Sequence, residues 1–209
     1  MLDVAELGFS YSTQVMPFTT DATIFQNVSW QLPEGSILYI QGANGAGKTT
    51  LLSCLAGMLR PTSGVIRYDG EDIQLQRARY QQHLCYVGHK TGITPGLTVF
   101  ENCLYDLKRS EHRDNLDGLL HETGLWALRY SPCSLLSAGQ KRRVGLLRLR
   151  LSATQVWLLD EPLVALDTAG KALLSRWLQT HLTAGGQVVY ASHQPLPELE
   201  AHQQVYPLC

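Results

Sequence analysis

A glycine-rich octapeptide, Gly42-Ala-Asn-Gly-Ala-Gly-Lys-Thr49, has the residue types and the spacing of a polyphosphate-binding loop. Its glycines allow the backbone to wrap around an anion, so that successive N–H groups and the positive end of the next helix face the phosphates. Lys48 would reach the β and γ phosphates of a nucleotide, and the Thr49 hydroxyl would bind Mg²⁺. The candidate nucleotide-binding residues are therefore Gly42, Ala43, Asn44, Gly45, Ala46, Gly47, Lys48, Thr49 and Thr50.

Two adjacent carboxylates follow an apolar run much later in the chain. The segment from Val156 onwards would form a buried strand that places Asp160 and Glu161 at its carboxyl end, where α/β proteins bind ligands. Asp160 would hold Mg²⁺, and Glu161 would polarise an attacking water. The alternative is a simple turn before Pro162. With the phosphate loop upstream, the pair predicts hydrolysis of a nucleoside triphosphate.

A third segment, Leu-Ser-Ala-Gly-Gln at 136–140, separates the protein families that share this phosphate loop. Ser137 is a good N-cap, and the small residues after it leave the helix N-terminus open to an anion. The basic run at 141–150 could indicate nucleic-acid binding. Its interleaved valine and leucines instead favour an amphipathic helix with one solvated side.

Strands and helices alternate along the chain in the order that positions these groups. Strands are expected at 2–11, 25–32, 36–41, 83–88, 155–160 and 187–192, and helices at 48–59, 137–151 and 169–182. A polar stretch at 12–23 would join the first two strands, 61–70 would form a hairpin, and 100–130 would form a small helical lobe. This alternation favours a mainly parallel sheet with crossover helices.

Composition limits the classes of protein. The 209 residues include 44% hydrophobic ones, enough for one ordinary domain, and 17 basic against 18 acidic side chains give no general electrostatic attraction for nucleic acid. The five cysteines are scattered, without the spacing of a zinc site, which is typical of free thiols in a reducing cytosol. We expect neither a secretion signal nor a membrane span, because no run approaches about 18 apolar residues.

The order of these segments, with Ala165-Leu-Asp167 after the carboxylates and His193 after the last strand, resembles the ATP-binding subunit of ABC transporters. The resemblance covers essentially the whole chain. It implies one α/β domain over 1–209, a P-loop core with a mainly parallel sheet, an N-terminal antiparallel β-subdomain and a small inserted helical subdomain. The core and β-subdomain would comprise about 1–88 and 153–209, with the Q-loop, helical lobe and signature helix at about 89–152.

The resemblance also implies a homodimer that holds two ATP molecules between its subunits. Lys48, Glu161 and His193 would be catalytic. His193 would donate a hydrogen bond to the γ-phosphate and stabilise the transition state. Asp167 would contact the facing subunit. The residues that would contact the partner's ATP are Ser137, Ala138, Gly139 and Gln140.

Three positions depart from the family's pattern. Ala138 stands where the family usually has glycine, which predicts binding with a slightly altered geometry. His89 replaces the glutamine that reaches Mg²⁺ and the attacking water, and its imidazole can still donate or accept a hydrogen bond. Tyr11 is the predicted adenine-stacking residue, with Phe18 as the competitor, because the segment from Tyr11 to Gly42 is longer than usual.

Several features resemble the branch of the family that serves cytochrome c maturation and haem export. They are a short chain without a C-terminal regulatory domain, Gly88-His89, the alanine in the signature, Trp-Leu-Leu-Asp-Glu-Pro, and His193-Gln-Pro-Leu196. This implies a peripheral subunit on the cytoplasmic face of a bacterial inner membrane, with integral permease partners and no nucleic acid. A permease helix would dock in a groove around 89–102, where Thr94 and Thr98 are the positions to test.

Other functions explain fewer of these residues. The ATPase of another small importer or exporter is the main alternative within the family. A soluble nucleic-acid ATPase of the ABC type would carry coiled-coil insertions, zinc modules or a basic face. A small-molecule kinase would not explain Ser137 or Asp167, and a GTPase would need an Asn-Lys-x-Asp segment that the sequence lacks.

Overall fold

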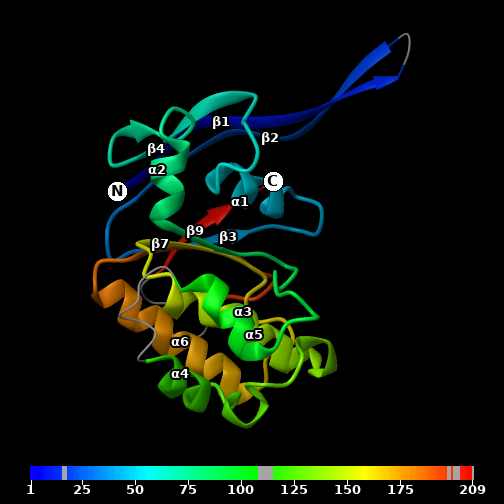
Figure 1. Cartoon of the computed structure of the whole chain (residues 1–209). Helices are drawn as coiled ribbons and strands as arrows, with labels where there is room; N and C mark the ends of the chain where they lie inside the picture. The colour runs from blue at the N-terminus through cyan, green and yellow to red at the C-terminus, as the bar shows by residue number, and fades with distance from the viewer. Residues whose placement is uncertain (16–17, 108–114, 197–198, 200–202, 209) are drawn as a thin grey trace.

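A computed structural model describes residues 1–15, 18–107, 115–196, 199 and 203–208, without the side chains of 12–15 and 18–21. Its strands form a four-stranded sheet in the order β2-β1-β4-β5 and a five-stranded sheet in the order β6-β7-β8-β3-β9. Figure 1 shows the first sheet above the second, with helix α1 between them and helices α3 to α6 below. The fold class expected from the sequence is confirmed.

The antiparallel sheet contains β1 (Leu2–Val15), β2 (Phe18–Leu32), β4 (Ser63–Tyr68) and β5 (Glu71–Asp72). β1 pairs with β4 only as far as Gly8, but it pairs with β2 along its whole length, so the hairpin continues past the other strands (Figure 1). Residues 12–15 and 18–23 of the predicted polar connection therefore belong to the two strands. Their threonines suit a strand, and each strand satisfies the other's backbone hydrogen bonds.

The second sheet is parallel throughout and contains β3 (Ile37–Gln41), β6 (Leu84–Val87), β7 (Val156–Asp160), β8 (Gln187–Ala191) and β9 (Gln203–Pro207). Alternate side chains enter two separate cores: Tyr39 lies with the helices below, and Leu38 lies with α1 and the antiparallel sheet. This two-sided burial explains the apolar runs of β3, β7 and β8. Strand β9 is polar and lies at an edge, and sequence reasoning missed it.

The helices are α1 (Lys48–Leu55), α2 (Arg77–Gln82), α3 (Val99–Asp106), α4 (Leu116–Glu122), α5 (Ala138–Leu151) and α6 (Thr168–Thr183). Helices α3 and α4, with short 3₁₀ turns at Trp126–Leu128 and Cys133–Leu135, form the lobe that the sequence placed between two strands. Buried Asn102 fixes the segment before α3 to that helix. Its Oδ1 accepts from the Thr94 N–H at 2.7 Å, and its Nδ2 donates to the Thr94 carbonyl at 3.1 Å.

His181 packs under the parallel sheet. Its ring stacks on Trp157 with the centroids 3.7 Å apart, and its Nε2 lies 3.1 Å from the carbonyl oxygen of Gln155. Burial lowers the pKa of His181 from 6.5 to about 4. The folded chain thus keeps this imidazole neutral at pH values where the unfolded chain protonates it.

We expect the free energy of unfolding to fall as the pH is lowered from 6.5 to 5, because over this interval His181 is protonated in the unfolded state but stays neutral in the folded state. The variant His181→Gln should lose less stability over the same interval. Urea unfolding of both proteins at the two pH values measures the difference. Equal losses in the two proteins would contradict the assignment.

Candidate nucleotide-binding site

A hollow of about 340 Å³ opens at the carboxyl edge of the parallel sheet. Four neighbouring strands deliver its polar groups: β3 leads into the phosphate loop, β7 ends at Asp160, and His89 and His193 each lie two residues beyond β6 and β8. The lining residues are Ile24, Ala43, Asn44, Gly45, Gly47, Lys48, Thr49, Thr50, His89, Asp160, Glu161 and His193. The structure thus brings together segments that the sequence keeps far apart.

The phosphate loop presents the free end of α1 to this hollow. Gly47 caps the helix with φ 91° and provides no side-chain cap, and the first turn carries no acidic residue. Its N–H groups therefore stay available for an anion. Lys48 is 8% exposed, and its ammonium donates to the carbonyl oxygens of Gly42 at 2.7 Å and Ala43 at 2.9 Å. Phosphate oxygens of a ligand could take the place of these two carbonyls.

Ile24 of β2 contributes an apolar side chain to the lining of the hollow. A Cβ on Gly47 would lie 2.5 Å from Cγ2 of Ile24, so the loop passes directly against β2. Ile24 was missed at the sequence level, because one isoleucine in a strand gives no signal. Tyr11 is 48% exposed and packs edge-on against Phe9 with the centroids 4.9 Å apart, and it does not line the hollow. The side chain of Phe18 lies outside the described part.

A hydroxyl and a carboxylate meet at the floor of the hollow. Thr49 donates from Oγ1 to Oδ2 of Asp160 at 2.8 Å, although the two residues come from α1 and β7. Asp160 is 2% exposed. Hard oxygen atoms of this kind are the ligands that Mg²⁺ prefers, usually with substrate phosphates completing its shell. The residues present therefore fit this ion, and His89 lines the same hollow.

Glu161 and His193 form a second polar pair. Oε1 of Glu161 lies 3.4 Å from Nε2 of His193, and Oε2 accepts hydrogen bonds of 3.4 Å from the Ser192 hydroxyl and the His193 N–H. Ser192 is buried and was not singled out by the sequence. The backbone of Glu161 has φ 48°, in the left-handed region that non-glycine residues rarely adopt. This conformation directs the carboxylate towards the end of β8.

The signature segment at 136–140 lies elsewhere. Ser137 caps α5: its hydroxyl accepts from the Gln140 N–H at 3.2 Å, and the Gln140 side chain accepts from the Ser137 N–H at 2.8 Å. Ser137 and Ala138 are exposed, whereas a Cβ on Gly139 would lie 2.9 Å from the carbonyl oxygen of Ala165. No residue of this segment lines the hollow of its own chain.

Asp167 lies at the start of α6, where its carboxylate accepts a 2.9 Å hydrogen bond from the Gly170 N–H. Arg143 donates to both of its oxygens at 2.6 and 2.7 Å. The Gly170 N–H and the Arg143 guanidinium lower the pKa of Asp167. The loop that precedes α6 is therefore fixed to the signature helix α5 within one chain.

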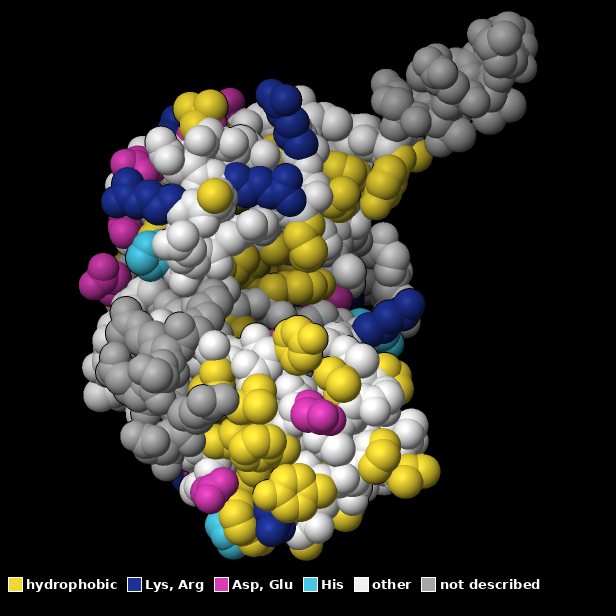
Figure 2. Space-filling view, viewed as in Figure 1, with side chains coloured by type: hydrophobic (Ala, Val, Ile, Leu, Met, Phe, Trp, Pro, Cys, Tyr) yellow, Lys and Arg dark blue, Asp and Glu magenta, His cyan; other side chains and the backbone are white. Residues whose placement is uncertain are grey.

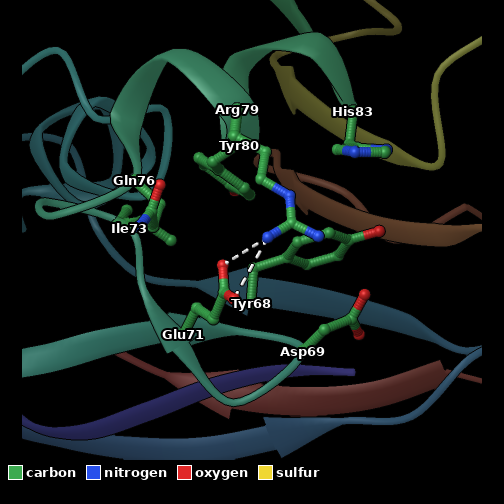
Figure 3. Close-up of a pocket in the computed structure, with 8 residues that line it drawn as sticks. All are labelled: Tyr68, Asp69, Glu71, Ile73, Gln76, Arg79, Tyr80 and His83. Atoms are coloured by element: carbon green, nitrogen blue, oxygen red, sulfur yellow. Dashed lines mark hydrogen bonds and ion pairs between the residues drawn. The ribbon is translucent and has the colours of Figure 1, made fainter.

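A separate, smaller hollow of about 150 Å³ lies between the β4–β5 turn and α2 (Figure 3). The rings of Tyr68, Tyr80 and His83 line it, and Arg79 pairs with Glu71 at 3.0 Å beside them. It shares no lining residue with the hollow at the phosphate loop. Its charges are already paired within the chain, so it carries no part of the chemistry above.

Two glycines of the phosphate loop allow a matched test of its packing. Gly45→Ala should cost about 1–2 kcal/mol, because φ is 84° there but no atom lies within 4 Å of the new methyl group. Gly47→Ala should cost about 1–3 kcal/mol more, because its methyl group must displace Ile24. Urea unfolding without nucleotide measures both losses. Equal stability of the two variants would contradict the contact between the phosphate loop and Ile24.

Comparisons with known proteins agree with this geometry. The sequence model described as ABC transporter matches residues 25–164. The cytochrome c biogenesis ATP-binding export protein CcmA of Legionella pneumophila is 45% identical over 208 residues, covering 100% of both chains. The protein of the same name from Haemophilus influenzae is 39% identical and covers 85% of both chains.

Solved structures show the same fold at low sequence identity. An ATP-binding subunit of an ABC transporter superposes with a TM-score of 0.85 at 22% identity, covering 98% of this chain and 85% of the other. A dimeric ATP-binding cassette in a post-hydrolysis state with ADP and phosphate gives 0.83 at 21% identity, covering 100% and 94%. The family match and the full-length relatives together establish that the chain belongs to the ABC transporter family.

Proposed function

We propose that this chain is the ATP-binding and ATP-hydrolysing subunit of a cytochrome c biogenesis export complex that handles haem. The observation that carries the proposal is the single hollow that gathers the phosphate loop, the Thr49–Asp160 pair and the Glu161–His193 pair. The full-length similarity to proteins named for cytochrome c biogenesis supports the finer assignment.

Each residue of the hollow has a task in ATP hydrolysis. The N–H groups at the start of α1 and the Lys48 ammonium bind the phosphates. Thr49 and Asp160 would hold Mg²⁺, which neutralises phosphate charge when bound. Glu161 orients the attacking water and accepts its proton, and His193 donates a hydrogen bond to the γ-phosphate as charge develops on it. His89 lines the same hollow and would reach Mg²⁺ and the attacking water, where the family usually has a glutamine.

A second copy of the chain completes the site. Ser137 and its neighbours lie at an exposed helix N-terminus outside the hollow of their own chain, so they can contact only a nucleotide that another subunit holds. Asp167 lies beside this helix and contacts the same partner. ATP therefore closes a homodimer around two nucleotides, and hydrolysis opens it. The dimeric cassette with a matching fold supports this arrangement.

The helical lobe carries the surface that would dock on a membrane partner. Tyr105, Tyr130 and Leu135 are 83%, 69% and 79% exposed, and Figure 2 shows hydrophobic side chains gathered over the helices in the lower half of the view. Exposed apolar side chains in such number favour a protein interface. No helix in the described part of the chain has the length and hydrophobicity to cross a membrane. The similarity to cytochrome c biogenesis ATP-binding export proteins supports a peripheral subunit on the cytoplasmic face of the inner membrane.

The structure distinguishes the two threonines proposed for a docking test. Thr98 caps α3, with its hydroxyl accepting from the Glu101 N–H at 3.2 Å and donating to the Glu101 carboxylate at 2.8 Å. A charge at this position would damage the helix itself. Thr94 is exposed, and its hydrogen bonds to Asn102 and Leu97 are made by its backbone. Thr94 is therefore the position at which an added charge tests docking without disturbing helix α3.

The substitution Glu161→Gln tests the catalytic assignment. The amide keeps the shape of the side chain but cannot accept the proton of water, so turnover should fall about 10²-fold or more while Mg-ATP still binds. Hydrolysis and nucleotide binding are measured on the same preparation. Wild-type hydrolysis should also rise more than linearly with protein concentration, because the site is split between two subunits. Near-normal turnover in the variant would remove Glu161 from the mechanism.

Purification of tagged Glu161→Gln protein with Mg-ATP from native membranes tests the partner. We expect multi-span proteins and a haem absorption band to accompany it. Adding Thr94→Glu should remove the membrane proteins while ATP binding persists, because a buried charge at the interface is costly. The control is Thr180→Glu, the same change at an exposed position on α6, which should retain them.

Each other outcome redirects the proposal. Multi-span partners without haem would keep a transporter ATPase and contradict the haem assignment. An intact ATP-bound dimer without any membrane partner would contradict the export role. Loss of ATP binding in Thr94→Glu would show that this segment belongs to the nucleotide site.

A further inference from the structure

One buried cation lies directly beneath the candidate site. Arg142 is 3% exposed and comes from the first half of α5. Its guanidinium donates to four backbone carbonyl oxygens: Gly88 at 2.9 Å, Asp160 at 3.1 Å, Glu161 at 2.8 Å and Pro162 at 3.4 Å. A buried charge persists only where such contacts replace water. The four carbonyls belong to two different loops, each of which carries a site residue.

The first loop is the one that holds Glu161. One nitrogen of Arg142, Nη2, donates to the carbonyl of Asp160 and to that of Glu161 itself. The φ of Glu161 is 48°, which is unfavourable for a residue with a side chain. On the other side, the Glu161 N–H donates to the Ala191 carbonyl at 2.8 Å. These contacts keep the backbone in the left-handed region and so direct the carboxylate towards His193.

The second loop begins at Gly88. Its carbonyl accepts from Nη1 of Arg142, and the next residue is His89, which lines the hollow. Burial lowers the pKa of Arg142, and the carboxylates of Asp160 and Glu161 raise it. The two carboxylates of the site thus favour the charged form of this buried guanidinium.

We propose that Arg142 is a positioning residue that fixes the Glu161 backbone and the His89 loop relative to the signature helix α5. The proposal rests on the function proposed above, in which the N-terminus of α5 contacts the partner's ATP. Arg142 lies one turn after that N-terminus, so movement of α5 on closure is transmitted to the two loops through one guanidinium. Arg142 itself touches neither the nucleotide nor the water.

The variant Arg142→Lys tests this, because it keeps the charge but loses the planar fork that reaches several carbonyls at once. In the full chain assembled with its membrane partners, we expect kcat to fall about 10- to 100-fold, since small misplacements of catalytic groups have effects of this size. The affinity for Mg-ATP should change less than about threefold, because the phosphate loop is untouched. Arg142→Gln, which keeps two N–H donors without burying a charge, is the second variant.

The matched control is Arg148→Lys. Arg148 lies on the same helix, donates to the carbonyl of Gly92 further along the His89 loop at 3.3 Å and pairs with Asp106 at 3.5 Å. Among the described residues it has no hydrogen bond to the Glu161 loop, so it is the control for the contacts that Arg142 makes there. A purely structural role for Arg142 predicts that kcat, ATP affinity and thermal stability decline together, and that Arg148→Lys behaves alike. That result, or an unchanged kcat in folded Arg142→Lys, overturns the proposal.

A crystal structure of Arg142→Lys gives a readout that does not depend on hydrolysis. We expect the backbone of Glu161 to leave the left-handed region and the 3.4 Å contact with His193 to be lost. An unchanged Glu161 would overturn the proposal. Failure of the wild-type complex to hydrolyse Mg-ATP would instead overturn the proposed function, and the two failures are thus distinguishable.

Discussion

The parallel sheet must be buried on both of its faces, and the rest of the molecule follows from this requirement. Alternate side chains of β3, β7 and β8 point into two cores, so the sheet needs a layer on each side. Helix α1 and the antiparallel sheet form one layer, and α5, α6 and the helical lobe form the other (Figure 1). Because all five strands run in the same direction, their carboxyl ends meet at one edge, and the polar groups after four of them converge there.

The same layering divides the nucleotide chemistry between two places. The phosphate loop and α1 belong to the upper layer, whereas the signature segment opens a helix of the lower layer. Within one chain, the N-terminus of α1 opens onto the hollow, whereas no residue of the signature segment lines it. In the proposed dimer, the site of each chain is complete only when a second chain supplies the N-terminus of its signature helix, so ATP itself would bring the two subunits together.

Charged side chains of α5 connect the lower layer to the carboxyl edge of the sheet and hold α5 against the start of α6. Arg142 reaches the loops at the carboxyl edge of the sheet, and Arg143 binds Asp167 at the start of α6. In the proposed dimer, one helix would therefore contact a partner's nucleotide at its N-terminus and the catalytic edge of its own chain through Arg142. A buried cation is costly unless all of its donors are used, so these contacts also fix the helix in one position.

Local sequence determined the parts of this protein whose geometry is set by neighbouring residues. The phosphate loop needs glycines with positive φ, the signature helix needs the Ser137 cap, and the buried strands need continuous apolar runs. Each of these features can therefore be predicted from a short segment of sequence. Tertiary structure alone decided the rest. Strand β9 forms because β3 offers it a free edge, and the polar residues 12–15 and 18–23 form strands because they pair with one another. Ile24 and Ser192 reach the site, and Arg142 reaches its backbone, only through contacts between distant segments, which no local pattern records.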